Sequence, residues 1–141
     1  DFANQMNLPI NIHSRDAHLD TLEILKKHNK NSKAIMHCYS GSLDFAKECI
    51  KEGIYISLGG VVTFKNAKSA KEVAANIPIE YLLLETDDPY LTPVPYRGEE
   101  NQPSYVKFVG QEIANLRGTT FEEITNATTQ NALKIFLTLN N

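Results

Sequence analysis

The sequence predicts an α/β domain in which about four parallel strands alternate with crossover helices. Short apolar segments alternate with longer segments of helical periodicity, and a polar residue or a glycine follows each apolar segment. These end positions recur at steady intervals: His13 and His37 are 24 residues apart, His37 and Gly60 are 23, and Gly60 and Asp87 are 27. Each interval accommodates one strand, one helix and two short connections, as parallel pairing requires.

Four strands and three helices are expected before residue 87. The strands are predicted at 8–13, 34–39, 54–58 and 81–85, and the helices between them at 16–28, 42–52 and 66–76. Residues 1–7 have helical spacing, so we expect the end of a helix there. Ser42 is the expected N-cap of the helix at 42–52, and Gly53 suits the left-handed position that commonly follows a helix.

After residue 87 the alternation stops. A long loop containing three prolines is expected at 88–102, and loops of this length in compact domains are commonly functional. Two helices are then predicted, at 103–117 and 120–137. Thr120 and Glu123 fit a capping box for the second, because each side chain can satisfy the other's backbone N–H.

Composition narrows the class of protein. With 141 residues, 42% of them hydrophobic and 22% charged, the chain has ordinary globular composition. A net charge of -3 excludes a general attraction to nucleic acid, so a polyanionic substrate would need a local basic patch or a bound metal. The two cysteines, Cys38 and Cys49, argue against a disulfide scaffold. No apolar segment approaches the roughly 20 residues of a membrane span, and no signal peptide is recognisable. We therefore expect a cytoplasmic protein without membrane contact.

Three candidate metal ligands follow separate predicted strands. His13 and His37 end the first two strands, and Asp87 follows the apolar strand at 81–85. Because parallel strands bring their C-terminal ends to one rim, these side chains are expected to converge. Two imidazoles and a carboxylate suit zinc or manganese. Taken singly, each histidine could be structural and Asp87 could cap a turn. His18, inside a predicted helix, is expected on the surface.

Polar neighbours of these residues are candidate substrate contacts. Arg15 could hold a phosphate through two parallel hydrogen bonds, or could pair with Asp16 or Asp20 on the surface. Tyr39 and Ser40 lie in a polar turn that enters a helix N-terminus. Such a turn can receive an anion, and it can equally serve only to cap the helix.

Four segments carry a family resemblance. They read Leu-Pro-Ile-Asn-Ile-His-Ser-Arg-Asp-Ala at 8–17, His-Cys-Tyr-Ser-Gly-Ser at 37–42, Tyr-Ile-Ser-Leu-Gly-Gly at 55–60 and Leu-Glu-Thr-Asp-Asp-Pro-Tyr-Leu-Thr-Pro at 84–93. In this order they resemble the TatD family of metal-dependent deoxyribonucleases, and the likeness covers nearly the whole chain.

The resemblance implies a TIM-type (β/α)8 barrel with a divalent-metal site that hydrolyses DNA phosphodiesters. His13, His37 and Asp87 match the family's last three metal positions. The implied cofactor is two divalent ions per complete site, Zn, Mn or Mg. In that mechanism Asp87 is also catalytic, as acceptor of the proton from the attacking water.

The chain departs from the family pattern in two ways. The family's initial His-Xaa-His strand and its later strand with a bridging glutamate are missing, so we expect 1–141 to be a single partial domain, the C-terminal half of the barrel. The family's Arg-Gly-Lys-Xaa-Asn-Glu-Pro segment reads Arg-Gly-Glu-Glu-Asn-Gln-Pro at 97–103, which exchanges a positive for a negative charge. Arg97 remains as a candidate phosphate contact.

Three alternatives stay open at this stage. The chain could be an inactive half-barrel that self-associates through exposed sheet edges. It could belong to a hydrolase of another ester or amide, since related sites serve several chemistries. It could also be an open, flavodoxin-like module that binds a phosphate at Gly59 and Gly60, although two glycines alone are a weak motif.

Overall fold

The computed structural model describes residues 1–28 and 33–136. Within them the chain forms, in order, α1 (Phe2–Met6), β1 (Ile10–His13), α2 (His18–His28), β2 (Ala34–His37), α3 (Leu43–Lys51), β3 (Tyr55–Leu58), the 3-10 helix η1 (Gly60–Thr63), α4 (Lys68–Asn76), η2 (Ile79–Tyr81), β4 (Leu82–Leu84), η3 (Pro103–Tyr105), α5 (Val106–Arg117) and α6 (Phe121–Phe136).

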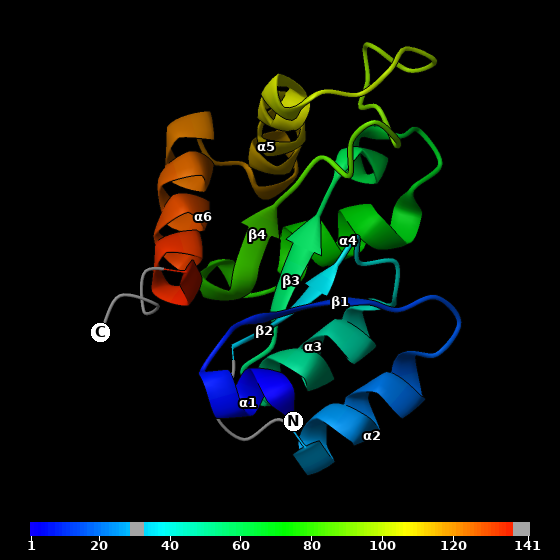
Figure 1. The fold of residues 1–141 in the computed structure, drawn as a ribbon. Coiled ribbons are helices and arrows are strands. Elements are labelled where there is room, and N and C mark those ends of the chain that lie inside the picture. Colours follow the sequence, from blue (N-terminus) through cyan, green and yellow to red (C-terminus); the bar gives the residue numbers. More distant parts are fainter. Residues whose placement is uncertain (29–32, 137–141) are drawn as a thin grey trace.

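The four strands form one parallel sheet in the order β1-β2-β3-β4, which confirms the predicted α/β class (Figure 1). Strands β1 and β2 pair without offset, from Ile10 opposite Ala34 to His13 opposite His37. Because all strands run in the same direction, the segments that follow them leave the sheet at one end. That end is where the candidate ligands were expected.

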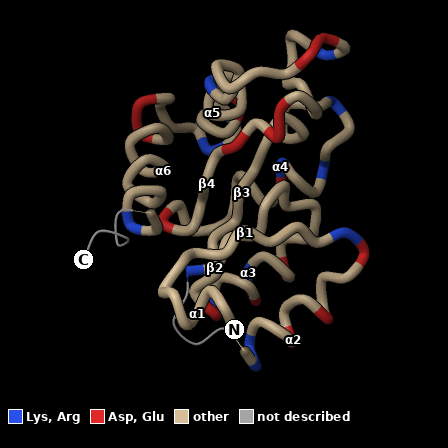
Figure 2. The backbone as a smooth tube through the Cα atoms, in the orientation of Figure 1, with Lys and Arg blue, Asp and Glu red and all other residues tan. Residues whose placement is uncertain are grey.

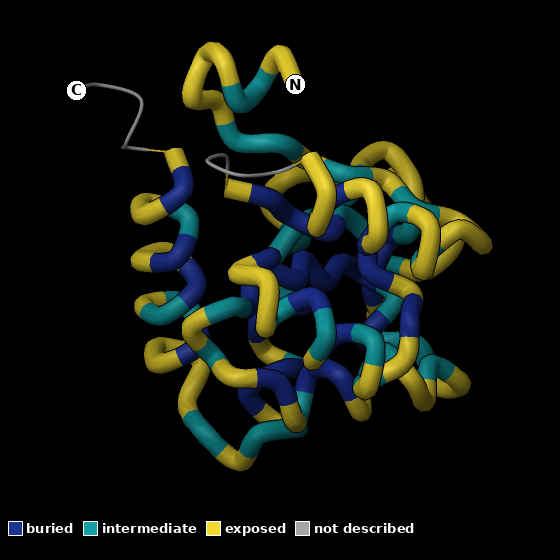
Figure 3. Tube along the Cα trace, turned by 90° about the horizontal axis from the view of Figure 1, so that it is seen from below, coloured by how far each residue is buried: buried dark blue, intermediate teal, exposed yellow. Residues whose placement is uncertain are grey.

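The two faces of the sheet carry different contacts. Met36, Ile56 and Leu82 point into the main apolar core, which also contains buried side chains of α3, α4 and α5. Ile35 and Leu83 point to the other face, where they pack with Ile135 of α6. Figure 3 shows the buried residues concentrated on the strands and on the inward sides of the helices. Successive side chains of a strand point to opposite faces of the sheet. This alternation determines which side chains at the strand ends share a face.

Local sequence signals act as expected. The Ser42 hydroxyl accepts a hydrogen bond from the N–H of Phe45, 3.2 Å away, and caps α3. Gly53 has φ 73°, the left-handed conformation predicted for it. At the start of α6 the N–H of Glu123 donates to the Thr120 hydroxyl, while the N–H of Thr120 donates to the Glu123 carboxylate, so the capping box is confirmed.

Two element boundaries differ from prediction because the backbone turns into the left-handed region. The second strand ends two residues early, at His37, and Cys38 has φ 46°. The first crossover helix begins two residues late, at His18, after Asp16 with φ 56°. The predicted end of the last helix, residue 137, lies outside the described residues.

Helix α6 contacts the outer edge of β4. The Asn131 amide donates to the carbonyls of Ile79 and Leu82, 2.8 and 2.9 Å away, so this side chain satisfies the Leu82 carbonyl at the outer edge of β4. Strand β1 lies at the opposite edge. In residues 1–28 and 33–136, no helix combines the length and apolar character needed to cross a membrane.

Candidate metal centre

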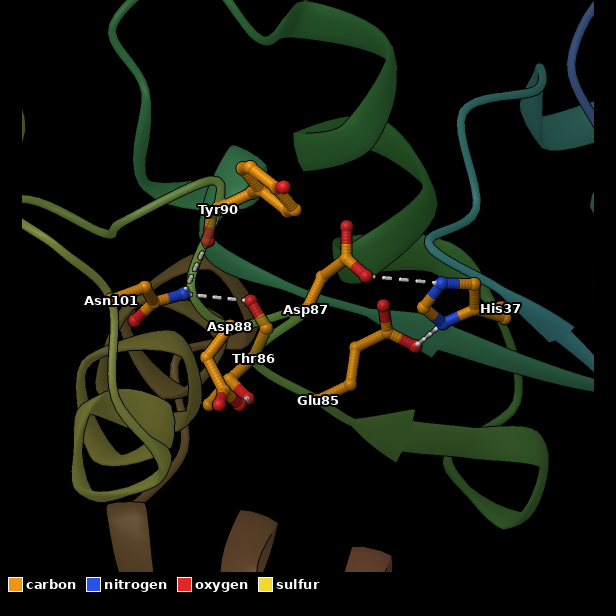
Figure 4. Close-up of polar contacts among 7 residues, drawn as sticks. All are labelled: His37, Glu85, Thr86, Asp87, Asp88, Tyr90 and Asn101. Carbon is orange, nitrogen blue, oxygen red and sulfur yellow. Dashed lines mark hydrogen bonds and ion pairs between the residues drawn. The ribbon is translucent and has the colours of Figure 1, made fainter.

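His13, His37 and Asp87 lie at the same end of the sheet. His13 and His37 are register partners at the ends of β1 and β2, with ring centroids 5.8 Å apart. Asp87 follows β4, and its Oδ1 is 3.3 Å from Nε2 of His37 (Figure 4). His37 therefore contacts both other candidates and stands at the centre of the trio.

The trio is not a finished ligand set. In the described part of the chain, no group of three or more His, Cys, Asp or Glu side chains is arranged to hold a metal ion. His37 and Asp87 offer one nitrogen and one oxygen donor side by side, a pair that suits a divalent ion such as zinc. These two adjacent donors and the neighbouring imidazole would need further ligands to hold a metal ion.

Glu85 is a component of this centre that sequence reasoning did not single out. Its Oε2 is 3.0 Å from Nδ1 of His37 (Figure 4), and its N–H donates to the Leu58 carbonyl, continuing the sheet by one residue. Its Oε1 is buried and has no hydrogen-bond partner among the described residues. A buried acceptor left without a partner costs on the order of 1–3 kcal/mol. Alternation puts Glu85 on the same face as Leu83, and the pairing of Leu83 with Ser57 shows which face this is; the sequence alone does not.

The turn that carries Asp87 is held from the long loop. Asp87 itself has φ 55°, which is uncommon for a residue with a side chain. The Asn101 amide donates to the carbonyls of Thr86 (2.8 Å) and Tyr90 (2.6 Å), on either side of Asp87 (Figure 4). Its Oδ1 accepts from the N–H of Gln102, and only 4% of Asn101 is exposed. A buried amide thus fastens the loop at 88–102 to the turn after β4.

Gly60 allows the same loop to lie directly on the end of β3. A Cβ atom at Gly60 would be 1.9 Å from the carbonyl oxygen of Leu91, so no other residue fits without movement of the backbone. Beside it, the Thr63 hydroxyl accepts from the N–H of Val94 at 2.9 Å. Gly60 therefore serves close backbone packing beneath the rim.

The four candidate substrate residues differ in position. Tyr39 is buried, its hydroxyl donates to the Ser42 carbonyl at 2.7 Å, and burial raises the pKa of that hydroxyl. Arg15 and Ser40 are exposed. The Arg97 guanidinium lies 3.9 Å from the ring centroid of Phe64. None of the four makes a hydrogen bond or ion pair with His13, His37 or Asp87 within residues 1–28 and 33–136.

Two further side chains, His18 and Cys38, are partly buried. His18, expected on the surface, is half-buried because its ring stacks on Phe45 with centroids 5.3 Å apart, and its Nδ1 lies 3.1 Å from the Ser14 hydroxyl. Cys38 is partly buried, and burial together with the charges of Glu85 and Asp87 raises the pKa of its thiol to about 11. A thiol protonated at neutral pH is a poor nucleophile, which argues against cysteine catalysis.

The rim is acidic. Figure 2 shows negatively charged residues on the segment that leaves β4 and again at the tip of the long loop. The first group contains Glu85, Asp87 and Asp88, and the second Glu99 and Glu100. Acidic side chains attract divalent cations and repel a phosphodiester, so this rim favours an anionic substrate only when cations neutralise it.

Comparison with known proteins gives a consistent result. A family described as TatD related DNase matches residues 1–137. The chain is 53% identical to a Bacillus subtilis protein named uncharacterized metal-dependent hydrolase YabD, over 95% of this chain and 53% of that protein. It is 41% identical to the similarly named YcfH of Escherichia coli K12, over 95% and 51%.

A solved structure gives the same match in three dimensions. The crystal structure of YjjV, a TatD homologue from E. coli K12, superposes with a TM-score of 0.90 at 32% identity. The superposed region covers 96% of this chain and 52% of YjjV. The four strands and their helices therefore correspond to half of a TatD-type TIM barrel. The chain spans about half the length of the curated relatives it matches. The chain belongs to the TatD family of metal-dependent hydrolases.

Proposed function

We propose that this chain forms the C-terminal half of a divalent-metal-dependent hydrolase that cleaves phosphodiester bonds in DNA. The observation that carries the proposal is the meeting of His13, His37 and Asp87 at one end of the sheet, with the His37 ring between the other two. Membership of a family of metal-dependent hydrolases, described as TatD related DNase, supports the same conclusion.

The proposed roles follow from donor chemistry. His13 and His37 would contribute nitrogen donors and Asp87 an oxygen donor, with the remaining ligands supplied by protein beyond these residues. A bound divalent ion, or a pair of Zn, Mn or Mg ions, makes water more acidic and polarises a phosphoryl group. Asp87 would also accept a proton during hydrolysis.

Substrate contacts are proposed for the exposed cations. Arg15, at the end of β1, and Arg97, stacked on Phe64, would bind backbone phosphates of DNA. Ser40, three residues after the end of β2, is exposed, and its hydroxyl would donate a hydrogen bond to the substrate. Tyr39 would act through its hydrogen bond to the Ser42 carbonyl, by holding this turn in shape. A cytoplasmic location is proposed as well, which the two free cysteines support.

The test compares two neighbouring carboxylates. Asp87→Asn should lower metal-dependent cleavage of a labelled DNA oligonucleotide by at least 100-fold in the protein of full family length. Asp88→Asn makes the same charge change one residue away, on an exposed side chain that is directed to Thr86 (Figure 4), and should stay within about threefold of wild type. Equal rates for wild type and Asp87→Asn would refute the assignment.

A second candidate substrate class is favoured by the acidic rim. Glu99 and Glu100 bring negative charge to the loop beside the site, which disfavours a polyanion and tolerates a neutral ester or amide. Cleavage of neutral esters or amides without cleavage of DNA would support this alternative over the first.

The 141-residue chain by itself is proposed to bind metal weakly, because the described residues hold no closed ligand set. Among residues 1–28 and 33–136 no strand pairs with the outer side of β1, and self-association would use this edge. Light scattering of the purified chain distinguishes a monomer from a dimer, and a dimer that persists when Asn11 on β1 is replaced by Pro would contradict the role of that edge.

A further inference from the structure

We propose that Glu85 is a positioning residue that keeps a proton on Nδ1 of His37, so that the lone pair of Nε2 faces the strand-end site. This inference deepens the proposed function and rests on it in one respect, that His37 donates to a metal through Nε2.

The first step of the argument concerns hydrogen-bond donors. An ionised carboxylate only accepts hydrogen bonds, so an ionised Glu85, whose Oε2 lies 3.0 Å from Nδ1 of His37, would select the tautomer that carries the proton on Nδ1. A second carboxylate oxygen, Oδ1 of Asp87, lies 3.3 Å from Nε2 on the other side of the ring. A neutral imidazole carries one N–H, so only one of the two carboxylates can receive it.

Geometry and burial favour Glu85. Its contact is the shorter of the two, and 15% of its side chain is exposed against 33% for Asp87. Glu85 also continues β4, because its N–H donates to the Leu58 carbonyl at 3.1 Å. Asp87 sits in a turn beyond the strand, with φ 55°. The proton of the neutral His37 ring is therefore assigned to Nδ1, beside Glu85. The lone pair of Nε2 and a lone pair of Asp87 Oδ1 then both face the strand-end site.

This arrangement is the one a metal ligand needs. A histidine that donates one ring N–H to a carboxylate has its tautomer and its ring orientation fixed for ligation through the other nitrogen. Oε1 of Glu85 adds no competing bond, because it is buried and has no partner among the described residues. The His37 contact is thus the one polar contact found for the Glu85 side chain within residues 1–28 and 33–136.

The test reads the tautomer directly in the metal-free chain. Long-range ¹H–¹⁵N spectra, recorded at a pH high enough for the ring to be neutral, should show His37 protonated at Nδ1 in wild type. Glu85→Gln keeps an acceptor oxygen and should keep this tautomer, whereas Glu85→Leu should move the proton to Nε2. Asp87→Ala should leave it on Nδ1.

Zinc titration supplies a second readout, followed through the His37 ¹⁵N shifts. Loss of such a supporting carboxylate typically weakens metal affinity about 10- to 100-fold, so Glu85→Leu should need that much more Zn²⁺ for half-saturation. Glu23→Leu removes an exposed carboxylate from α2 and should match wild type. A wild-type ring protonated at Nε2, or an unchanged Zn²⁺ midpoint in Glu85→Leu, would overturn the proposal. Absence of zinc at His37 in wild type would instead count against the proposed metal site, and the tautomer result would still decide the role of Glu85.

Discussion

Replacing Asn101 by Ala should detach the long loop from the turn that carries Asp87. The substitution removes two hydrogen bonds to the carbonyls of Thr86 and Tyr90 and a third from the N–H of Gln102. All three involve a side chain that is 4% exposed, so water cannot replace them unless the loop moves. The native bond from the Asn101 N–H to the Pro89 carbonyl would remain as a weaker attachment.

The magnitude follows from the number of bonds. Each net hydrogen bond contributes about 1 kcal/mol, so the loss should be about 2–3 kcal/mol once partial rehydration of the carbonyls is included. For a chain of this length, that corresponds to a fall in Tm of about 4–12 °C. Urea unfolding should show a lower midpoint with an unchanged m-value. Hydrogen exchange in the segment 86–102 should accelerate more than exchange in β2 or β3, because the loop opens first.

The matched control is the neighbouring residue. Gln102→Ala removes an exposed side chain and leaves the Asn101 amide in place, so its stability should stay within about 0.5 kcal/mol of wild type. If Asn101→Ala were as stable as this control and its loop exchanged no faster, the role assigned to Asn101 would be wrong.

Three further outcomes are expected. Arg117→Met removes the guanidinium that donates to the carbonyls of Ala74 and Ile77 at the end of α4, and should lower the free energy of unfolding by about 2 kcal/mol in urea; a loss below 0.5 kcal/mol would contradict it. Gly60→Ala places a Cβ against the Leu91 carbonyl and should cost over about 3 kcal/mol, whereas Gly53→Ala, with open space but φ 73°, should cost about 1 kcal/mol. The pKa of the Cys38 thiol is raised from 9.0 to about 11, so this thiol should react slowly with iodoacetamide at pH 8 and faster as the pH nears 11. Burial of the protonated thiol stabilises the fold fully below pH 9, and this contribution is lost as the pH rises through 11. Rapid alkylation at pH 8 would refute the last expectation.

The fold was predictable because its signals are local. Apolar runs such as 82–84, the Ser42 cap and the Thr120–Glu123 capping box each act within a few residues, and the steady spacing of strand ends reports the parallel order. Boundaries were less predictable where one residue turns left-handed, as at Cys38, because a non-glycine residue gives little sign of that conformation.

The supporting residues of the site were not predictable from the same signals. Glu85 follows three leucines that indicate burial but not direction, and only the register of β3 and β4 places it on the His37 face. Asn101 lies in a loop without periodicity, and its partners Thr86 and Tyr90 are 15 and 11 residues away. Side chains that act through such contacts become visible only when the backbone is known.

The most direct measurement for the central claim uses Mn²⁺ as a paramagnetic probe of the ¹⁵N-labelled chain. Paramagnetic broadening falls steeply with distance and detects even weak, partial occupancy, so it does not require a complete ligand set. Substoichiometric Mn²⁺ should broaden the resonances of His13, His37 and Asp87 first, and the His37→Ala variant should lose this pattern. Broadening centred on Glu99 and Glu100, or spread evenly over the acidic surface, would contradict a metal site at the end of the sheet.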